Sequence, residues 1–133
     1  MKIGHIALSV GNLRRSVAFY KKNFGFKCVR SYVHPEIGLT ITFLKKSALT
    51  LELFQFKKHY KFPVYRRELD SDLRTIGVKH FSFEMSNIKE AFKRFKKAKV
   101  KFATNMRTFD NGQRYFFVRD PDGIPIELME THK

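Results

Sequence analysis

Two kinds of side chain that bind metal ions recur in this chain at one fixed spacing. His5 and His80 lie 75 residues apart, and Glu52 and Glu127 are separated by the same 75 residues. Imidazole nitrogens and carboxylate oxygens together suit a borderline divalent ion such as Zn, Ni, Co, Mn or Fe(II). A carboxylate beside such an ion can also move a proton. The four residues therefore predict a metal site first and a catalytic site second.

The sequences around these residues align at the same spacing. Residues 4–13 match residues 79–88, and residues 49–54 match residues 124–129. A lone strand histidine is more often bonded to a neighbour than to a metal, but the shared spacing and the matching Glu pair favour metal binding. We therefore expect a duplicated module, in which two copies related by a pseudo-two-fold each bring one imidazole and one carboxylate to a common centre.

Each copy has the pattern β-α-β-β-β. Alternating apolar residues predict the strands, and Asn12 and Asn87 are the expected N-caps of the two helices. The predicted fold class is α+β: two tandem βαβββ modules forming an eight-stranded, cup-shaped mixed sheet with helices on the outside. The first copy has strands near 3–10, 27–33, 40–45 and 49–56, and a helix from 12 to about 24. The second has strands near 78–85, 101–106, 113–119 and 125–130, and a helix from 87.

One domain accounts for the whole chain, 1–133, because its length allows a single core. Module one covers about 1–56, a linker covers about 57–76, and module two covers about 77–133. The linker is the longest irregular stretch and is rich in basic and aromatic residues. Loops of this length are commonly functional or mobile. A lid that contacts substrate and a plain connection both remain open.

Strand parity decides whether the four predicted ligands can share one face of the sheet. Side chains alternate between faces along a strand, so each ligand points away from the apolar residues beside it. A carboxylate between apolar residues calls for a partner, because burying an unpaired charge is costly. The opposing residues are Ile6 and Leu8 for His5, Leu51 and Leu53 for Glu52, Phe81 and Phe83 for His80, and Ile126 and Leu128 for Glu127.

The net charge of +15 would suit a nucleic acid, an anionic surface or an acidic small molecule. Much of it falls on the second helix, where a solvated helix face explains it better than a nucleic-acid footprint, because no nucleic-acid-binding motif accompanies it. No apolar stretch is long enough to span a bilayer, and the N-terminus lacks a signal-peptide pattern. A single cysteine, Cys28, is compatible with the reducing cytoplasm, where we expect the protein to act.

Four segments together resemble the vicinal oxygen chelate superfamily, which includes glyoxalase I, bleomycin and fosfomycin resistance proteins, extradiol dioxygenases and methylmalonyl-CoA epimerase. The resemblance spans nearly the whole chain, and its most specific part is the Asp-Pro-Asp-Gly turn at 120–123 followed by Ile-Glu-Leu at 126–128. The four segments are 4–10, 16–26, 79–83 and 115–128.

Within this superfamily the ligand set is most similar to that of glyoxalase I, a lactoylglutathione lyase with His, Glu, His and Glu in this chain order. The resemblance implies metal ligands at His5, Glu52, His80 and Glu127. It implies conversion of a 2-oxoaldehyde thiohemiacetal to a 2-hydroxyacyl thioester through an enediolate held by the ion, as in methylglyoxal detoxification. Glu127 would be the main base, and Glu52 would be a ligand with a possible catalytic role on the opposite face.

The same resemblance implies a small-molecule substrate, either a glutathione adduct or the adduct of another thiol. Lys22 and Arg94 lie where glyoxalases place cations for glutathione carboxylates. Phe54 shares the face of Glu52 and could line a pocket, and Arg114 completes the candidate substrate contacts. A homodimer is expected, with the site closed either within one chain or between the first module of one chain and the second module of the other.

Two other classes of function stay open. One is another metalloenzyme of the superfamily: an extradiol-type dioxygenase, an epimerase, or a thiol transferase that acts on an antibiotic. The other is a metal-free resistance protein that sequesters a ligand in the cup. For a metal-free protein, Glu52 and the two histidines would be a coincidence. The epimerases typically carry Gln where Glu52 stands, so Glu52 favours the glyoxalase type.

Overall fold

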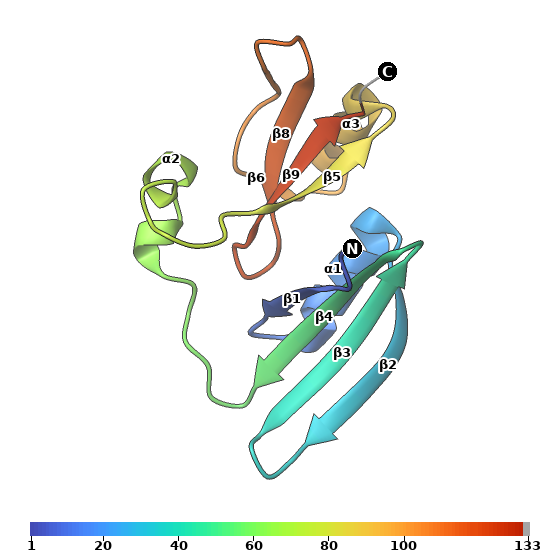
Figure 1. Cartoon of the computed structure of the whole chain (residues 1–133), viewed down its shortest axis with the longest axis vertical. Helices are drawn as coiled ribbons and strands as arrows, with labels where there is room; N and C mark the ends of the chain where they lie inside the picture. Colours follow the sequence, from blue (N-terminus) through green and yellow to red (C-terminus); the bar gives the residue numbers. More distant parts are fainter. Residues whose placement is uncertain (132–133) are drawn as a thin grey trace. The chain divides into compact units, whose positions relative to one another are not determined.

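The computed structural model describes residues 1–131, so the last two residues of the predicted second module lie outside it. The chain divides into two compact units, Met1–Lys61 and Phe62–Lys133, and each unit builds a mixed sheet of its own (Figure 1). This agrees with the predicted α+β class. Among residues 1–131, no helix is both long enough and apolar enough to cross a membrane.

The first unit has the predicted order of one strand, one helix and three strands. Its sheet has the order β1-β4-β3-β2, in which β1 runs parallel to β4 and the other neighbours are antiparallel (Figure 1). The elements are β1 (Ile6–Ser9), α1 (Leu13–Phe24), β2 (Lys27–His34), β3 (Leu39–Lys46) and β4 (Leu49–Phe56).

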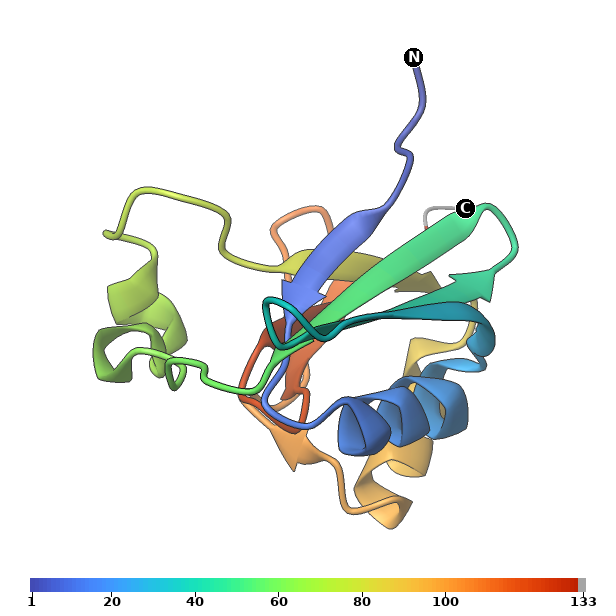
Figure 2. The same ribbon diagram turned by 90° about the horizontal axis from the view of Figure 1, so that it is seen from below.

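Helix α1 begins and ends where local sequence signals predict. The Asn12 side chain accepts a hydrogen bond from the backbone N–H of Arg15, and Gly25 ends the helix with a left-handed φ of 74°. Tyr20 and Phe24 are buried on its inner side. The helix packs along one face of the sheet, against β2 and β4 (Figure 2). The opposite face of this sheet is therefore the one that can carry a site.

The second unit repeats the arrangement after a short helical segment. Its main sheet order is β5-β9-β8-β6, β7 pairs with β8, and β5 runs parallel to β9. Helix α3 packs against β8 and β9, with Phe95 and Phe116 fully buried between the layers. The elements are η1 (Val64–Arg66), α2 (Leu69–Asp72), β5 (Phe81–Met85), α3 (Ile88–Lys97), β6 (Lys101–Phe102), β7 (Arg107–Thr108), β8 (Arg114–Arg119) and β9 (Pro125–Glu130).

The strand register repeats at the spacing found in the sequence. Ala7 of β1 pairs with Glu52 of β4, and Ser82 of β5, 75 residues after Ala7, pairs with Glu127 of β9. The side chain of Asn87 caps α3 as Asn12 caps α1, again 75 residues earlier. The two units therefore share strand order, register and helix start, which supports the predicted duplication.

The predicted strand at 101–106 is wrong beyond its first two residues: only β6, Lys101–Phe102, forms there, and a second short strand, β7, follows at Arg107–Thr108. The backbone N–H groups of Ala103 and Thr104 both donate to the carbonyl oxygen of Phe117, and the Thr104 hydroxyl accepts the N–H of Phe117 at 3.0 Å. Two successive residues that face one partner break the ladder register, as a β-bulge does. The second sheet consequently has five strands in the described residues, where the predicted module has four.

Strand β5 begins at Phe81, three residues later than predicted. The carbonyl oxygen of Val78 accepts a hydrogen bond from Arg66 at 2.6 Å, and the Lys79 ammonium donates to the carbonyl oxygen of Asp72 at 2.7 Å. These bonds connect the residues before β5 to the segment that precedes them and not to the sheet. The apolar pattern alone carried no sign of this anchorage.

Candidate metal centre

The first unit brings His5 and Glu52 together. Glu52 lies in the middle of β4, between Ala7 of β1 and Phe43 of β3. His5 lies two residues before Ala7, so strand alternation places its side chain on the same face. The distance between His5 Nε2 and Glu52 Oε2 is 3.2 Å. The carboxylate is largely shielded, and the imidazole is half exposed, with side chains 15% and 53% accessible.

The second unit brings His80 and Glu127 together in the same way. Glu127 lies in β9 between Ser82 of β5 and Phe117 of β8. The distance between His80 Nε2 and Glu127 Oε2 is 3.4 Å. The Phe117 ring meets the His80 ring edge to face, with centroids 5.0 Å apart, and this contact fixes the orientation of the imidazole. Phe117 occupies the place beside Glu127 that Phe43 occupies beside Glu52.

The geometry of each pair fits two neighbouring ligands of one ion. Metal–nitrogen and metal–oxygen bonds of about 2.1 Å, at angles between 90° and 109°, separate adjacent donors by about 3.0 to 3.4 Å. The two observed separations, 3.2 and 3.4 Å, fall in this range. Among residues 1–131, neither unit by itself groups three or more His, Cys, Asp or Glu side chains for a metal. Each unit therefore offers half of the four-donor set, and its completion from both modules stays a prediction.

The other predicted residues lie at different places in the two units. Phe54 of β4 is half-buried on the face of Glu52, two residues further along the strand. Lys22 is exposed on α1, and Arg94 is exposed on α3 with its guanidinium 5.2 Å from the centroid of the Phe95 ring. Both helices cover the sheet face opposite to the glutamate of their own unit. Within its own unit, therefore, neither cation lies on the face of the His–Glu pair.

Arg114 also lies away from the pair in its unit. It precedes Tyr115, which pairs with Met129 on the face of Glu127, so the Arg114 side chain points to the other face. There its guanidinium makes a two-pronged ion pair with Glu130, including a bond of 2.8 Å from Nε. These hydrogen bonds raise the pKa of Arg114. The structure does not bring Arg114 to Glu127.

An ion cluster that sequence reasoning missed joins the predicted linker to the start of the second module. Asp72 is 2% exposed and accepts two hydrogen bonds from the Arg66 guanidinium, at 2.9 and 3.2 Å, and one from Lys79 at 3.2 Å. The Arg66 bonds are the main cause that holds the pKa of Asp72 below its usual value. The sequence offered little signal, because Asp72 is one of three acids, with Glu68 and Asp70, in a short stretch between arginines.

Because Lys79 precedes His80 directly, this cluster fixes the chain just before a predicted ligand. The first unit has no such anchorage, since the four residues before His5 are all exposed. The difference matches the exposed fractions of the two imidazoles, 32% for His80 and 53% for His5. The second pair is consequently the less exposed of the two.

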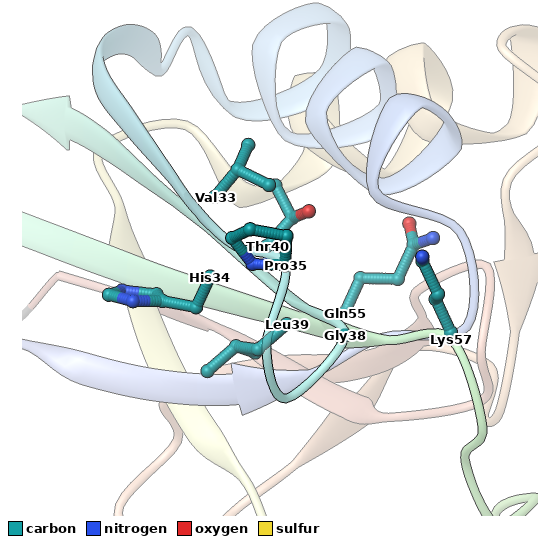
Figure 3. A pocket seen from close by; sticks show the side chains of 8 residues that line it. All are labelled: Val33, His34, Pro35, Gly38, Leu39, Thr40, Gln55 and Lys57. Atoms are coloured by element: carbon teal, nitrogen blue, oxygen red, sulfur yellow. The ribbon is translucent and has the colours of Figure 1, made fainter.

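A shallow pocket in the first unit lies away from these residues. It is at the end of the β2–β3 hairpin, and Val33 and Gln55 point to the side on which α1 lies (Figure 3). The Gln55 side chain is already used, since its oxygen accepts the backbone N–H of Leu13 at the start of α1. None of the predicted site residues lines this pocket, so it supports no part of the candidate centre.

Comparisons with known proteins identify the family and related folds. The family model of the Glyoxalase/Bleomycin resistance protein/Dioxygenase superfamily matches residues 2–128. The chain is 29% identical over 131 residues to the lactoylglutathione lyase of Escherichia coli O157:H7, which covers 98% of this chain and 93% of that protein. It is 25% identical over 140 residues to the mitochondrial methylmalonyl-CoA epimerase of Homo sapiens, with 98% and 74% covered. A glyoxalase family protein from Enterococcus faecalis has a similar structure, with a TM-score of 0.83, 27% identity and 97% of both chains covered.

Proposed function

The chain belongs to the glyoxalase, bleomycin resistance protein and dioxygenase superfamily, and on this premise we propose that it is a metal-dependent lyase of the glyoxalase I type. Its substrate is the thiohemiacetal of a 2-oxoaldehyde, and its product is a 2-hydroxyacyl thioester. The reaction is an isomerisation. A proton leaves the carbon that bears sulfur and hydroxyl and returns to the neighbouring carbonyl carbon, while the hydroxyl proton passes to the other oxygen. Nothing is oxidised by an external agent.

The observation that carries the proposal is the repetition of one His–Glu pair in both modules. The two carboxylates occupy equivalent places in equivalent sheets, each beside a phenylalanine on one neighbouring strand and a small residue on the other. A largely buried carboxylate is expensive to keep without a partner. That both modules retain this arrangement supports a shared ligand, and its donor chemistry suits a divalent ion such as Zn, Ni, Co, Mn or Fe(II).

In this proposal His5, Glu52, His80 and Glu127 hold the ion. When bound, the ion supplies Lewis-acid polarisation of two neighbouring substrate oxygens, which makes the adjacent C–H acidic. Glu127 removes that proton and delivers it to the next carbon, because its carboxylate is shielded from water and held beside His80. Phe117 packs edge to face against the same imidazole and restricts its orientation. Glu52 acts as ligand and assists on the opposite face.

The proposal includes a homodimer, as the resemblance to the superfamily implies. The four donors are then completed either within one chain or between the two copies. Light scattering measures the molecular mass in solution, and the mass of a single chain would contradict the proposed homodimer. Mixing the inactive variants His5→Ala and His80→Ala then distinguishes the two arrangements. A site shared between chains recovers about a quarter of the wild-type activity after joint refolding, because half of the dimers then contain one intact site out of two. A site within one chain recovers none.

The central test is metal analysis followed by an activity assay. We expect protein purified without added metal to contain a divalent ion, or to bind one on reconstitution, and to consume the methylglyoxal–glutathione adduct. Oxygen uptake with a catechol in place of that activity would indicate a dioxygenase. A protein that binds no metal and still binds a ligand would overturn the proposal in favour of a sequestering protein.

A further inference from the structure

A β-bulge in the first unit turns Arg30 towards the face of Glu52. Cys28 pairs with Leu44 and Arg30 pairs with Phe43, so Val29 between them has no partner on β3. Without this extra residue, Val29 would oppose Phe43 and Arg30 would point to the side of α1. The bulge leaves Val29 55% exposed. Bulges often re-aim a side chain beside a functional site, and this one re-aims a cation.

The register then places Arg30 in one row with the candidate ligand. Arg30 of β2 pairs with Phe43 of β3, and Phe43 pairs with Glu52 of β4. Adjacent strands lie about 4.8 Å apart, so the backbones of Arg30 and Glu52 are separated by about 10 Å. A small molecule that reaches the His5–Glu52 pair across this face passes the Phe43 ring and meets Arg30.

Aromatic rings hold the guanidinium in position. The central carbon of the Arg30 guanidinium lies 4.3 Å from the centroid of the Phe43 ring and 5.7 Å from that of Tyr32. These two rings meet edge to face at 6.2 Å. A guanidinium that packs on aromatic rings keeps its planar fork of N–H donors available for a carboxylate. The packing therefore orients Arg30 and leaves its hydrogen-bonding edge open.

The charges around Arg30 favour an anionic ligand. Glu52 is the one carboxylate within the four strands of this unit, and no hydrogen bond or ion pair engages the Arg30 side chain among residues 1–131. Lys27 and Lys45, which pair with each other, add positive charge on the same face. In the second unit, the place across from Phe117 is taken by the buried Thr104, whose hydroxyl bonds the backbone. The site is therefore a property of the first module.

We propose that Arg30, packed on Phe43 and Tyr32, is a carboxylate-binding residue that makes the protein select substrates with an acidic group that reaches across the Phe43 ring from the His5–Glu52 pair. This inference rests on the proposed function and deepens it. The preferred substrate is then a 2-oxoaldehyde adduct of a thiol that carries a carboxylate, as glutathione does, and not of a neutral thiol. Arg30 takes no part in the proton transfer.

Binding of two matched ligands tests the proposal without turnover. S-methylglutathione has free carboxylates, and its diethyl ester has the same frame without them. By calorimetry, we expect the wild-type protein to bind the acid more tightly than the ester. Arg30→Met weakens binding of the acid by about tenfold or more, the effect of losing a charge-assisted pair of hydrogen bonds. It leaves binding of the ester within about twofold. Arg30→Lys, which keeps the charge and loses the fork, falls in between.

The control variant is Arg14→Met, which removes an exposed cation on α1, on the other side of the sheet. It tests whether net charge alone attracts the acid, and we expect a change below about twofold. The proposal is overturned if the wild-type protein does not prefer the acid, or if Arg30→Met weakens acid and ester equally. Selective binding without isomerase activity refutes the proposed function and leaves this subsite intact, whereas activity with a KM that Arg30→Met does not alter refutes the subsite alone.

Discussion

The Asp72 cluster offers the sharpest test of what holds the second unit together. Asp72→Asn keeps the size and shape of the side chain but removes its charge. The carboxylate accepts three side-chain hydrogen bonds from Arg66 and Lys79, and bonds to charged groups contribute about 1.5 to 3 kcal/mol each when fully buried. Arg66 and Lys79 are partly accessible to water, with side chains 26% and 19% exposed. Once the carboxylate is removed, water solvates these two cations and offsets part of the lost hydrogen-bond energy. The Asn side chain also keeps one oxygen that can accept a hydrogen bond from them.

We therefore expect Asp72→Asn to lower the free energy of unfolding by about 2 to 3 kcal/mol at pH 7, somewhat less than the loss of a fully buried ion pair. Urea unfolding followed by circular dichroism measures the change. The matched control is Asp70→Asn on the same short helix, an exposed position where we expect less than about 0.5 kcal/mol. A value for Asp72→Asn as small as that of the control would refute the cluster as a source of stability.

The difference in the free energy of unfolding between wild type and Asp72→Asn should depend on pH in a defined direction. The folded-state pKa of Asp72 is lowered, chiefly by its hydrogen bonds with Arg66. A lowered carboxyl pKa contributes stability that is complete above the unfolded value of about 4 and is lost as the pH falls through the folded value. The gap between wild type and Asp72→Asn is thus constant near neutrality and shrinks below about pH 4. A gap that widens in acid would contradict the assignment.

Three further outcomes follow from the candidate centre. Glu127→Gln should lower kcat by about a thousandfold in steady-state assays, as loss of a general base does. The control Glu84→Gln changes an exposed carboxylate on the same face, and its kcat should stay within about twofold of wild type. Similar losses of kcat in both variants would contradict the assigned role of Glu127. Phe117→Ala should lower the free energy of unfolding by about 3 kcal/mol in urea unfolding, because it removes a ring that is 8% exposed and contacts His80. A change in this free energy below about 1 kcal/mol would contradict that packing. Removal of the ion with a chelator should abolish activity and lower the thermal midpoint, and a divalent ion should restore both; full activity after chelation would exclude a metal mechanism.

Local features of the fold could be predicted because their causes are local. The N-caps Asn12 and Asn87 satisfy helix N–H groups within the next three residues, so the helix starts depend on little else. Strand β4 has the predicted bounds, since alternation and the turn before it define a hairpin. The meeting of each His with its Glu followed from strand parity and from the repeat. The metal-binding role of these pairs, and their union in one centre, stay predictions.

The sequence by itself determined the repeat, the order of strands and helices, and the two His–Glu pairs, because spacing and periodicity are properties of short stretches. Tertiary structure decided which side chains face the pairs. The unpaired Val29 puts Arg30 on the face of Glu52, and the shared carbonyl of Phe117 interrupts the strand after α3. Arg66 donates a hydrogen bond to Asp72 within a segment for which the sequence predicted no regular structure. One unpaired residue reverses the face of every side chain that follows, and only the ladder with a distant strand shows where it lies.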